Sequence, residues 1–124
     1  MSWLTAHADV ENCYLMTKGR RTGNPHEVEI WFGVVGDGLY LISGNGGTAD
    51  WYRNALANPD VTVRIKTETN AGVARPVTDE AKRLSVGELM GVKYPWDGDA
   101  SISLTFEAWC FDVPLLAISS WTEV

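Results

Sequence analysis

The chain has 124 residues, a length typical of one domain, and ten lysines and arginines against sixteen aspartates and glutamates give it a formal net charge of −6. This acidic balance argues against a general binder of nucleic acid or anionic membranes, because affinity for phosphate backbones depends on positive charge. No apolar run approaches a membrane span, and the first nine residues lack the pattern of a signal peptide. We therefore expect one cytoplasmic domain over residues 1–124. Two cysteines and two histidines without metal-ligand spacing predict neither a disulfide scaffold nor a metal site.

Short strands and glycine-rich turns fill the first half of the chain. The strands are predicted from apolar or alternating runs that stop at glycine, asparagine or proline. They cover residues 13–18, 27–32, 39–43 and 61–65. A helix is predicted over residues 49–57, with Thr48 as its N-cap and Asn58-Pro59 after its end.

The second half of the chain mixes one helix with further strands. Asn70-Ala71-Gly72 is predicted as a turn that leads into a strand, and Thr78 as the cap of a helix over residues 79–92. After a loop at residues 94–99, two strands are predicted at 102–111 and 115–121. Predicted strands outnumber helices, so the fold class is mainly β (α+β). A small barrel with helices at its ends fits this order better than a parallel βαβ sheet.

One turn gathers positive charge in this acidic chain. Lys18, Arg20 and Arg21 lie in a stretch, residues 12–26, that contains no carboxylate, and Thr22 and Gly23 follow them. Guanidinium groups and exposed turn N–H groups are suited to binding phosphate. A solvated turn that is polar for solubility would look the same.

A second candidate is the glycine-rich segment Ser43-Gly44-Asn45-Gly46-Gly47-Thr48 before the predicted helix. Flexible backbone at a helix N-terminus can present N–H groups to an anion or a carbonyl, although such a segment can also be purely conformational. Trp51 and Asn54, three residues apart on that helix, share a face. A ring beside an amide suits a flat heterocycle, while a tryptophan on a helix is more often part of the core.

No pair of nucleophile and base stands out. Glu27 and Glu29 share a strand face without an acid–base partner, and His26 has no orienting carboxylate beyond its neighbour. If the chain is an enzyme, a cofactor would bring the reactive group. The six tryptophans could fill a core or line a pocket for a planar ligand, and Tyr94 and Trp96 could form a lid over it.

Several of these motifs occur together in one order: residues 14–25, 29–32, 43–47, Trp51-Tyr52-Arg53-Asn54 and 58–63. In this order they resemble the deazaflavin-dependent nitroreductase family, a branch of the split β-barrel flavin and deazaflavin oxidoreductases. The resemblance implies a split β-barrel of six or seven mostly antiparallel strands with two or three short helices, FMN-binding-like in architecture. It also implies coenzyme F420, whose reduced form delivers hydride to an acceptor, and no metal.

The resemblance also implies roles for particular residues. The phosphate of the coenzyme would be held by the turn, and the deazaflavin ring would be surrounded by the glycine-rich segment, one side of the helix and a barrel floor. The implied contacts are Lys18, Arg20, Arg21, Thr22 and Gly23 for the phosphate, and Ser43, Gly44, Asn45, Gly46, Gly47, Trp51, Asn54, Ile30, Trp31 and Phe32 for the ring. Tyr94 would lie on the acceptor side as a proton donor, with solvent as the alternative donor.

The leading hypothesis is an F420-dependent oxidoreductase that passes hydride to a quinone, a nitro compound or an activated double bond. Two alternatives stay open: an FMN-dependent reductase of the same fold, and a non-enzymatic protein that binds the coenzyme or another hydrophobic ligand. The expected partner is a small-molecule acceptor rather than nucleic acid, and the chain is expected to be a monomer or a homodimer.

Overall fold

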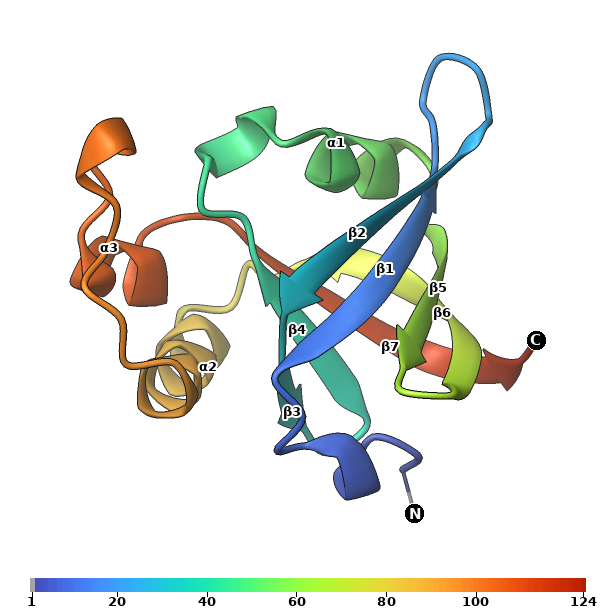
Figure 1. Cartoon of the computed structure of the whole chain (residues 1–124), viewed down its shortest axis with the longest axis horizontal. Helices are drawn as coiled ribbons and strands as arrows, with labels where there is room; N and C mark the ends of the chain where they lie inside the picture. Colours follow the sequence, from blue (N-terminus) through green and yellow to red (C-terminus); the bar gives the residue numbers. More distant parts are fainter. Residues whose placement is uncertain (1) are drawn as a thin grey trace.

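The computed structural model describes residues 2–124, in which one antiparallel sheet is combined with short helices (Figure 1). The strands are β1 Asn12–Lys18, β2 Pro25–Trp31, β3 Gly33–Val35, β4 Gly38–Ile42, β5 Asp60–Ile65, β6 Glu68–Pro76 and β7 Leu115–Glu123. The helices are α1 Asp50–Ala57, α2 Glu80–Lys93 and α3 Phe106–Phe111. Three single 3-10 turns are added at η1 Thr5–His7, η2 Gly46–Thr48 and η3 Ala100–Ile102.

The seven strands pair in the order β2-β1-β5-β6-β7-β4-β3, and every pairing is antiparallel. The sheet curls, so that β2 at one end of this order comes into contact with β4 near the other. Helix α1 connects β4 to β5 and lies against β1, β2 and β6 (Figure 1). Helices α2 and α3 form the connection from β6 to β7 and pack against each other beside β3.

Two hydrophobic clusters result, one on each side of β4. Strand β4 is buried at every position. Leu39 and Leu41 point into the interior of the curled sheet, whereas Tyr40 and Ile42 belong to a second cluster that includes α2 and α3. Because side chains alternate along a strand, this one strand supplies both clusters and anchors the helices to the barrel.

The predicted turn at residues 70–72 is wrong. These residues lie inside β6, and the hairpin between β5 and β6 is instead made at Lys66, which has a positive φ of 56°. Gly72 serves a close approach: a Cβ there would lie 2.7 Å from Ile118 Cγ2 and 2.8 Å from the Trp121 ring. The register between β6 and β7 shifts at this point, as at a β-bulge, where glycine is frequent.

The predicted strand at residues 102–111 is also wrong, because α3 occupies most of this segment. Thr105 caps α3, accepting a hydrogen bond at its hydroxyl from Ala108 N at 3.0 Å. Trp109 and Cys110 face the second cluster. The apolar run is dense enough to suit either element, and the cap decides for the helix.

Two predicted helix caps are each displaced by one residue. Asp79, not Thr78, caps α2, with its carboxylate accepting from Lys82 N at 3.2 Å. Thr48 ends η2, and Ala49 stands at the N-cap of α1 without a side-chain hydrogen bond. Within residues 2–124, no helix is both long and apolar enough to cross a membrane.

Candidate functional site

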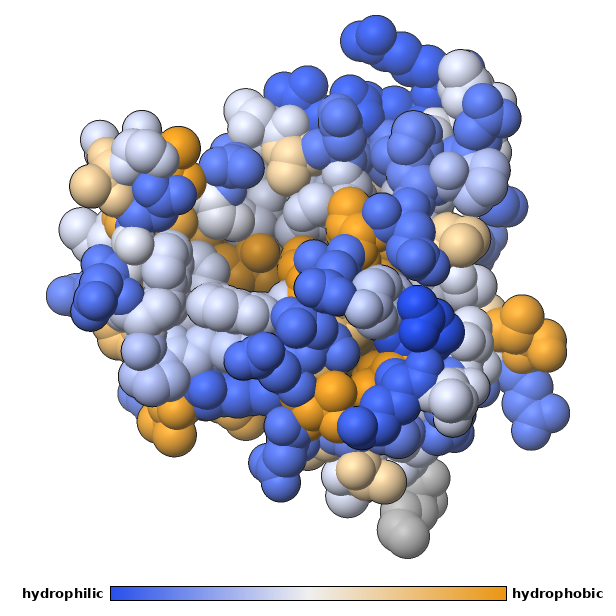
Figure 2. Space-filling model, in the orientation of Figure 1, coloured by the Kyte–Doolittle hydropathy of each residue, from blue (hydrophilic) through white to orange (hydrophobic). Residues whose placement is uncertain are grey.

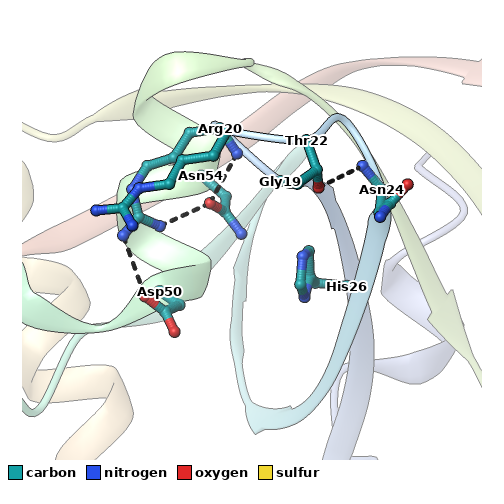
Figure 3. Close-up of a pocket in the computed structure, with 8 residues that line it drawn as sticks. Gly19, Arg20, Thr22, Asn24, His26, Asp50 and Asn54 are labelled. Carbon is teal, nitrogen blue, oxygen red and sulfur yellow. Dashed lines mark hydrogen bonds and ion pairs between the residues drawn. The ribbon is translucent and has the colours of Figure 1, made fainter.

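The turn between β1 and β2 forms a hollow with helix α1. We call it the basic hollow; it has a volume of about 390 Å³ (Figure 3). Its walls come from the turn, from the start of β2 and from the first half of α1. The lining residues are Gly19, Arg20, Arg21, Thr22, Asn24, His26, Asp50 and Asn54.

Arg20 is fastened to α1 by the side chain of Asn54. Asn54 Oδ1 accepts from Arg20 N at 3.2 Å and from Arg20 Nη1 at 2.8 Å, and Asn54 Nδ2 donates to Thr17 Oγ1 at 3.3 Å. Asn54 and Thr17 are 2% and 1% exposed. A further guanidinium nitrogen, Arg20 Nη2, lies 3.2 Å from Asp50 Oδ1 (Figure 3). Asn54 therefore positions the turn, and its carbonyl oxygen is used within the protein rather than offered to a ligand.

The turn is closed by its own backbone. Gly19 N donates to Asn24 O, and Gly23 N donates to Gly19 O, both at 2.8 Å. Gly23 has a φ of 76°, a conformation that favours glycine. A Cβ on Gly19 would lie 2.9 Å from His26 Nε2, so a glycine there lets the imidazole approach the turn. His26 thus joins the basic hollow, which the sequence alone did not indicate.

A second hollow of about 370 Å³ lies farther along β2. We call it the aromatic hollow; it is lined by Asn12, Glu29, Ile30, Trp31, Ile42 and Trp109. Figure 2 shows hydrophobic surface at the bottom of a depression between α3 and β2. The Trp31 ring is stacked on the Tyr94 ring with centroids 4.5 Å apart, and it meets the Trp109 ring edge-on at 5.8 Å. Rigid aromatic walls of this kind suit a flat apolar ligand.

The glycine-rich segment lies beside this aromatic hollow without lining it. Ser43 is 1% exposed, and its hydroxyl donates to Gly46 O at 2.5 Å. Gly44 leaves room for Leu104 and Trp109, which would be 3.4 and 3.7 Å from a Cβ there. Asn45 O accepts from the Thr48 hydroxyl, and Gly47 O accepts from Arg53 Nε at 2.9 Å. These bonds hold the segment between β4 and α1, next to Trp109, which lines the aromatic hollow.

Tyr94 directly follows α2 and is buried. It is 6% exposed; its hydroxyl accepts from Phe32 N at 3.1 Å and lies 2.7 Å from Glu11 O and 2.9 Å from Phe32 O. Burial raises its pKa to about 12. The hydroxyl therefore ties α2 to the junction of β2 and β3, and the ring supports Trp31. Of the two interpretations of Tyr94 and Trp96, lid or local packing, the structure favours packing, since both rings pack in the second hydrophobic cluster.

Phe32 and Lys93 form a further contact at the C-terminal end of α2. Phe32 is 0% exposed, so its side chain is part of the core and does not line the aromatic hollow. Lys93 Nζ donates to Phe32 O at 2.8 Å and lies 3.8 Å from the centroid of the Phe32 ring. Burial lowers the pKa of Lys93 to about 8.

Three other implied contacts lie apart from the two hollows. Lys18 is exposed on the side of β1 opposite Thr17, and with Gly23 it lines a separate hollow on the outer face of the sheet. Trp51 packs against the interior cluster, edge-on to Tyr52, which agrees with the core interpretation of a helical tryptophan. Of the implied residues, Arg20, Arg21, Thr22 and Asn54 gather at the basic hollow, and Ile30 and Trp31 at the aromatic hollow.

Several lining residues were missed by the sequence reasoning. The sequence predicts a strand at Trp109, and only the formation of α3 brings this residue to Trp31. Ile42 and Asp50 carry no site signal in the sequence beyond their positions in a strand and a helix. Glu29 and Asn12 occupy the rim because β1 and β2 pair Asn12 with Trp31 and Tyr14 with Glu29. The one sequence signal that could indicate any of these residues is the position of Asp50, at the start of a helix just after the glycine-rich segment.

The two hollows offer complementary chemistry. The basic hollow supplies guanidinium groups suited to an oxyanion, and the aromatic hollow supplies flat apolar walls. Within residues 2–124, no group of three His, Cys, Asp or Glu side chains could hold a metal ion. The arrangement can bind a ligand that joins an anionic group to a planar ring.

Comparison with solved structures tests the predicted fold class. An F420-H2-dependent reductase superposes with a TM-score of 0.69 at 19% identity, covering 89% of this chain and 95% of that one. An F420 reductase superposes with a TM-score of 0.63 at 15% identity, covering 98% and 97% of the two chains. These likenesses confirm the split-barrel fold class.

Comparison of sequences identifies the family. An F420H(2)-dependent quinone reductase of Mycobacterium tuberculosis is 30% identical over 66 residues, which are 51% of this chain but 44% of that relative. The match thus spans less than half the length of the curated relative. The family model for the F420H(2)-dependent quinone reductases matches residues 5–95, from the first 3-10 turn to the end of α2 and just beyond. Because this match covers most of the chain and both hollows lie largely within it, the chain belongs to the F420H(2)-dependent quinone reductase family.

Proposed function

We propose that this chain binds coenzyme F420 and serves as an oxidoreductase, through which hydride passes from the reduced coenzyme to a small organic acceptor. Quinones, nitro compounds and activated double bonds are the candidate acceptors. Family membership supports the coenzyme, and quinone reductase activity is what the matched relative is named for. Location in the cytoplasm and a monomeric or homodimeric state stay predictions.

The observation that carries the proposal is the placement of both hollows along β2. His26 lines the basic hollow and Ile30 lines the aromatic one. These two residues are four positions apart on one strand, which corresponds to roughly 13 Å at about 3.3 Å per residue. A phosphate and a flat ring joined by a sugar-alcohol chain can together reach both hollows. The donor set therefore fits the phosphate and the ring of the coenzyme.

Each part of the site has a separate task in this proposal. The turn binds the phosphate through Arg20 and Arg21, and Asn54 holds Arg20 in place. Trp31, Trp109 and Ile42 exclude water from one side of the ring. When bound, the reduced coenzyme supplies the hydride. Glu29 is the one acid or base lining the aromatic hollow, at its exposed rim, so we assign protonation of the product to solvent.

The experiment is a fluorescence titration with F420, followed by a screen for oxidation of the reduced coenzyme with a quinone, a nitroaromatic and an enone. Arg20→Ala and Arg21→Ala should each weaken F420 binding about tenfold or more, because hydrogen bonds to charged groups contribute about 1.5–3 kcal/mol. Arg75→Ala, at an exposed position of β6 away from both hollows, is the matched control.

The possible results separate the alternatives. Affinity that stays within about twofold for both turn variants contradicts the phosphate assignment, given the size of a charged contact. Tight F420 binding without oxidation by any acceptor would make the chain a carrier. A parallel titration with FMN tests the flavin-dependent alternative, which predicts FMN binding and no response to F420.

A further inference from the structure

The basic hollow contains an acidic residue. Asp50 lies on its wall, and its carboxylate oxygen Oδ1 is 3.2 Å from Arg20 Nη2. The charged side chains that line the hollow are Arg20, Arg21 and Asp50, beside the imidazole of His26. With His26 counted as neutral, two positive charges and one negative charge leave a single net positive charge.

Arg20 is also less available than its position indicates. One edge of its guanidinium is bonded to the buried Asn54, and Nη2 is paired with Asp50. The side chains of Arg20 and Asp50 are 25% and 83% exposed. Asp50 is thus largely exposed to solvent, and its carboxylate lies beside the Arg20 guanidinium (Figure 3). A phosphate that needs both guanidinium edges has to displace this carboxylate.

We propose that Asp50 is a specificity-determining residue that makes the basic hollow select phosphodiesters over terminal phosphate monoesters. This rests on the proposed function, in which the hollow receives the phosphate of the coenzyme. A phosphodiester has one negative charge, which balances the net charge of the hollow. A monoester, such as the phosphate of FMN, has close to two charges above pH 7 and leaves an excess of negative charge beside Asp50. The filter therefore favours a coenzyme whose tail continues beyond its phosphate.

The size of the effect follows from the exposure of Asp50. Two unit charges about 6 Å apart in a water-like medium change a binding constant about threefold, and about tenfold where the effective dielectric constant is half as large. Because a monoester has about twice the charge of a diester, removing the charge of Asp50 should strengthen monoester binding by the square of the factor for the diester. The ratio of the two affinities then changes by about three- to tenfold, and salt reduces the change.

The test uses two deazaflavins that differ only in the phosphate, the ribityl phosphate monoester and its methyl diester. Both are titrated by fluorescence at pH 8 and low ionic strength against the wild-type chain and Asp50→Asn. We expect the diester to bind the wild type more tightly, and the monoester to gain about three- to tenfold more than the diester in Asp50→Asn. Asp50→Glu, which keeps the charge, should retain the wild-type preference. Asp37→Asn, an exposed position in the turn between β3 and β4, controls for the change in overall charge.

The outcomes separate a failure of the selection by Asp50 from a failure of the proposed function. Equal gains of the two compounds in Asp50→Asn, or an equal shift in Asp37→Asn, would overturn the selection by Asp50 while leaving the coenzyme site in place. If neither compound binds the wild type, the proposed function fails and the filter fails with it. Thermal melting of each variant verifies that it folds, which the 83% exposure of the Asp50 side chain leads us to expect.

Discussion

Asn54 provides the strongest test of how the basic turn is held. Its carbonyl oxygen accepts from both the backbone and the guanidinium of Arg20, and its amide donates to Thr17. At 2% exposure this amide is almost wholly buried. Substituting Asn54→Ala removes all three bonds at once and leaves the exposed Arg20–Asp50 pair to join the turn to α1. We therefore expect loss both of stability and of coenzyme affinity.

The magnitude follows from the individual bonds. The bond from the guanidinium is charge-assisted and contributes about 1.5–3 kcal/mol, whereas a neutral hydrogen bond contributes about 0.5–1.5 kcal/mol. Because the Arg20 side chain is 25% exposed, water replaces part of what is lost. We expect Asn54→Ala to lower the free energy of unfolding by about 2–3 kcal/mol, measured by urea denaturation. Affinity for F420 should fall about tenfold, because the ordered turn is lost.

A double-mutant cycle isolates the contact between the two residues. In the Arg20→Ala background, Asn54→Ala should cost about 1–2 kcal/mol less than in the wild type, because the shared bond is already absent. A coupling free energy below about 0.5 kcal/mol, within the usual limits of additivity, would refute the assignment of Asn54 as the residue that positions Arg20. Thr17→Val, which removes only the neutral partner, is the control.

Two further predictions concern the residues behind the aromatic hollow. Tyr94→Phe should lower the free energy of unfolding by about 1–3 kcal/mol, because buried partners at Phe32 and Glu11 lose their hydroxyl, and should leave kcat nearly unchanged. A fall in kcat of about 100-fold or more in a folded variant would instead identify Tyr94 as a proton donor. Burial lowers the pKa of Lys93 from 10.5 to about 8, so between these values the unfolded chain binds more protons, and the Lys93 contribution to stability rises with pH. Urea midpoints measured at pH 8 and pH 10 should show this rise in the wild type, and Lys93→Met should lack it. Burial raises the pKa values of Cys13 and Tyr94 to about 12, so these two groups lower stability as the pH rises, in the wild type and in the variant. Parallel pH profiles of the two proteins would contradict this role of Lys93.

Local pattern was sufficient for β1, β2, β4 and β5, but not for the short strand β3, which was not predicted. The alternation in β1 and β5 and the positive-φ glycines at the turns are local requirements, so they can be recognised without the fold. The second half was harder to predict, because there local pattern does not distinguish a helix from a strand. In residues 102–111 a dense apolar run satisfies either a strand or a helix, and packing against α2 together with the Thr105 cap selected the helix.

In the candidate site, too, some residues can be predicted from local sequence and others join only through the fold. Arg20, Arg21 and Thr22 could be assigned to an anion site because one turn holds them, and a turn stays together in any fold. Asp50 and His26 join that hollow only because α1 and β2 come to lie beside the turn. Tyr94 is the opposite case: in sequence it looks like an exposed loop aromatic, and in the structure its hydroxyl is buried against Phe32 and Glu11.

The sequence by itself determined an acidic chain rich in strands, with one basic turn, and the order of motifs that marks its family. Only the tertiary structure decided which charges share a hollow and which tryptophans form a wall. The physical reason is that charge and periodicity are properties of neighbouring residues, whereas the pairing of Arg20 with Asp50 and of Trp31 with Trp109 joins residues 30 and 78 positions apart in the chain. The net charge of −6 therefore says little about the basic hollow, whose local balance depends on Asp50 alone among the aspartates and glutamates.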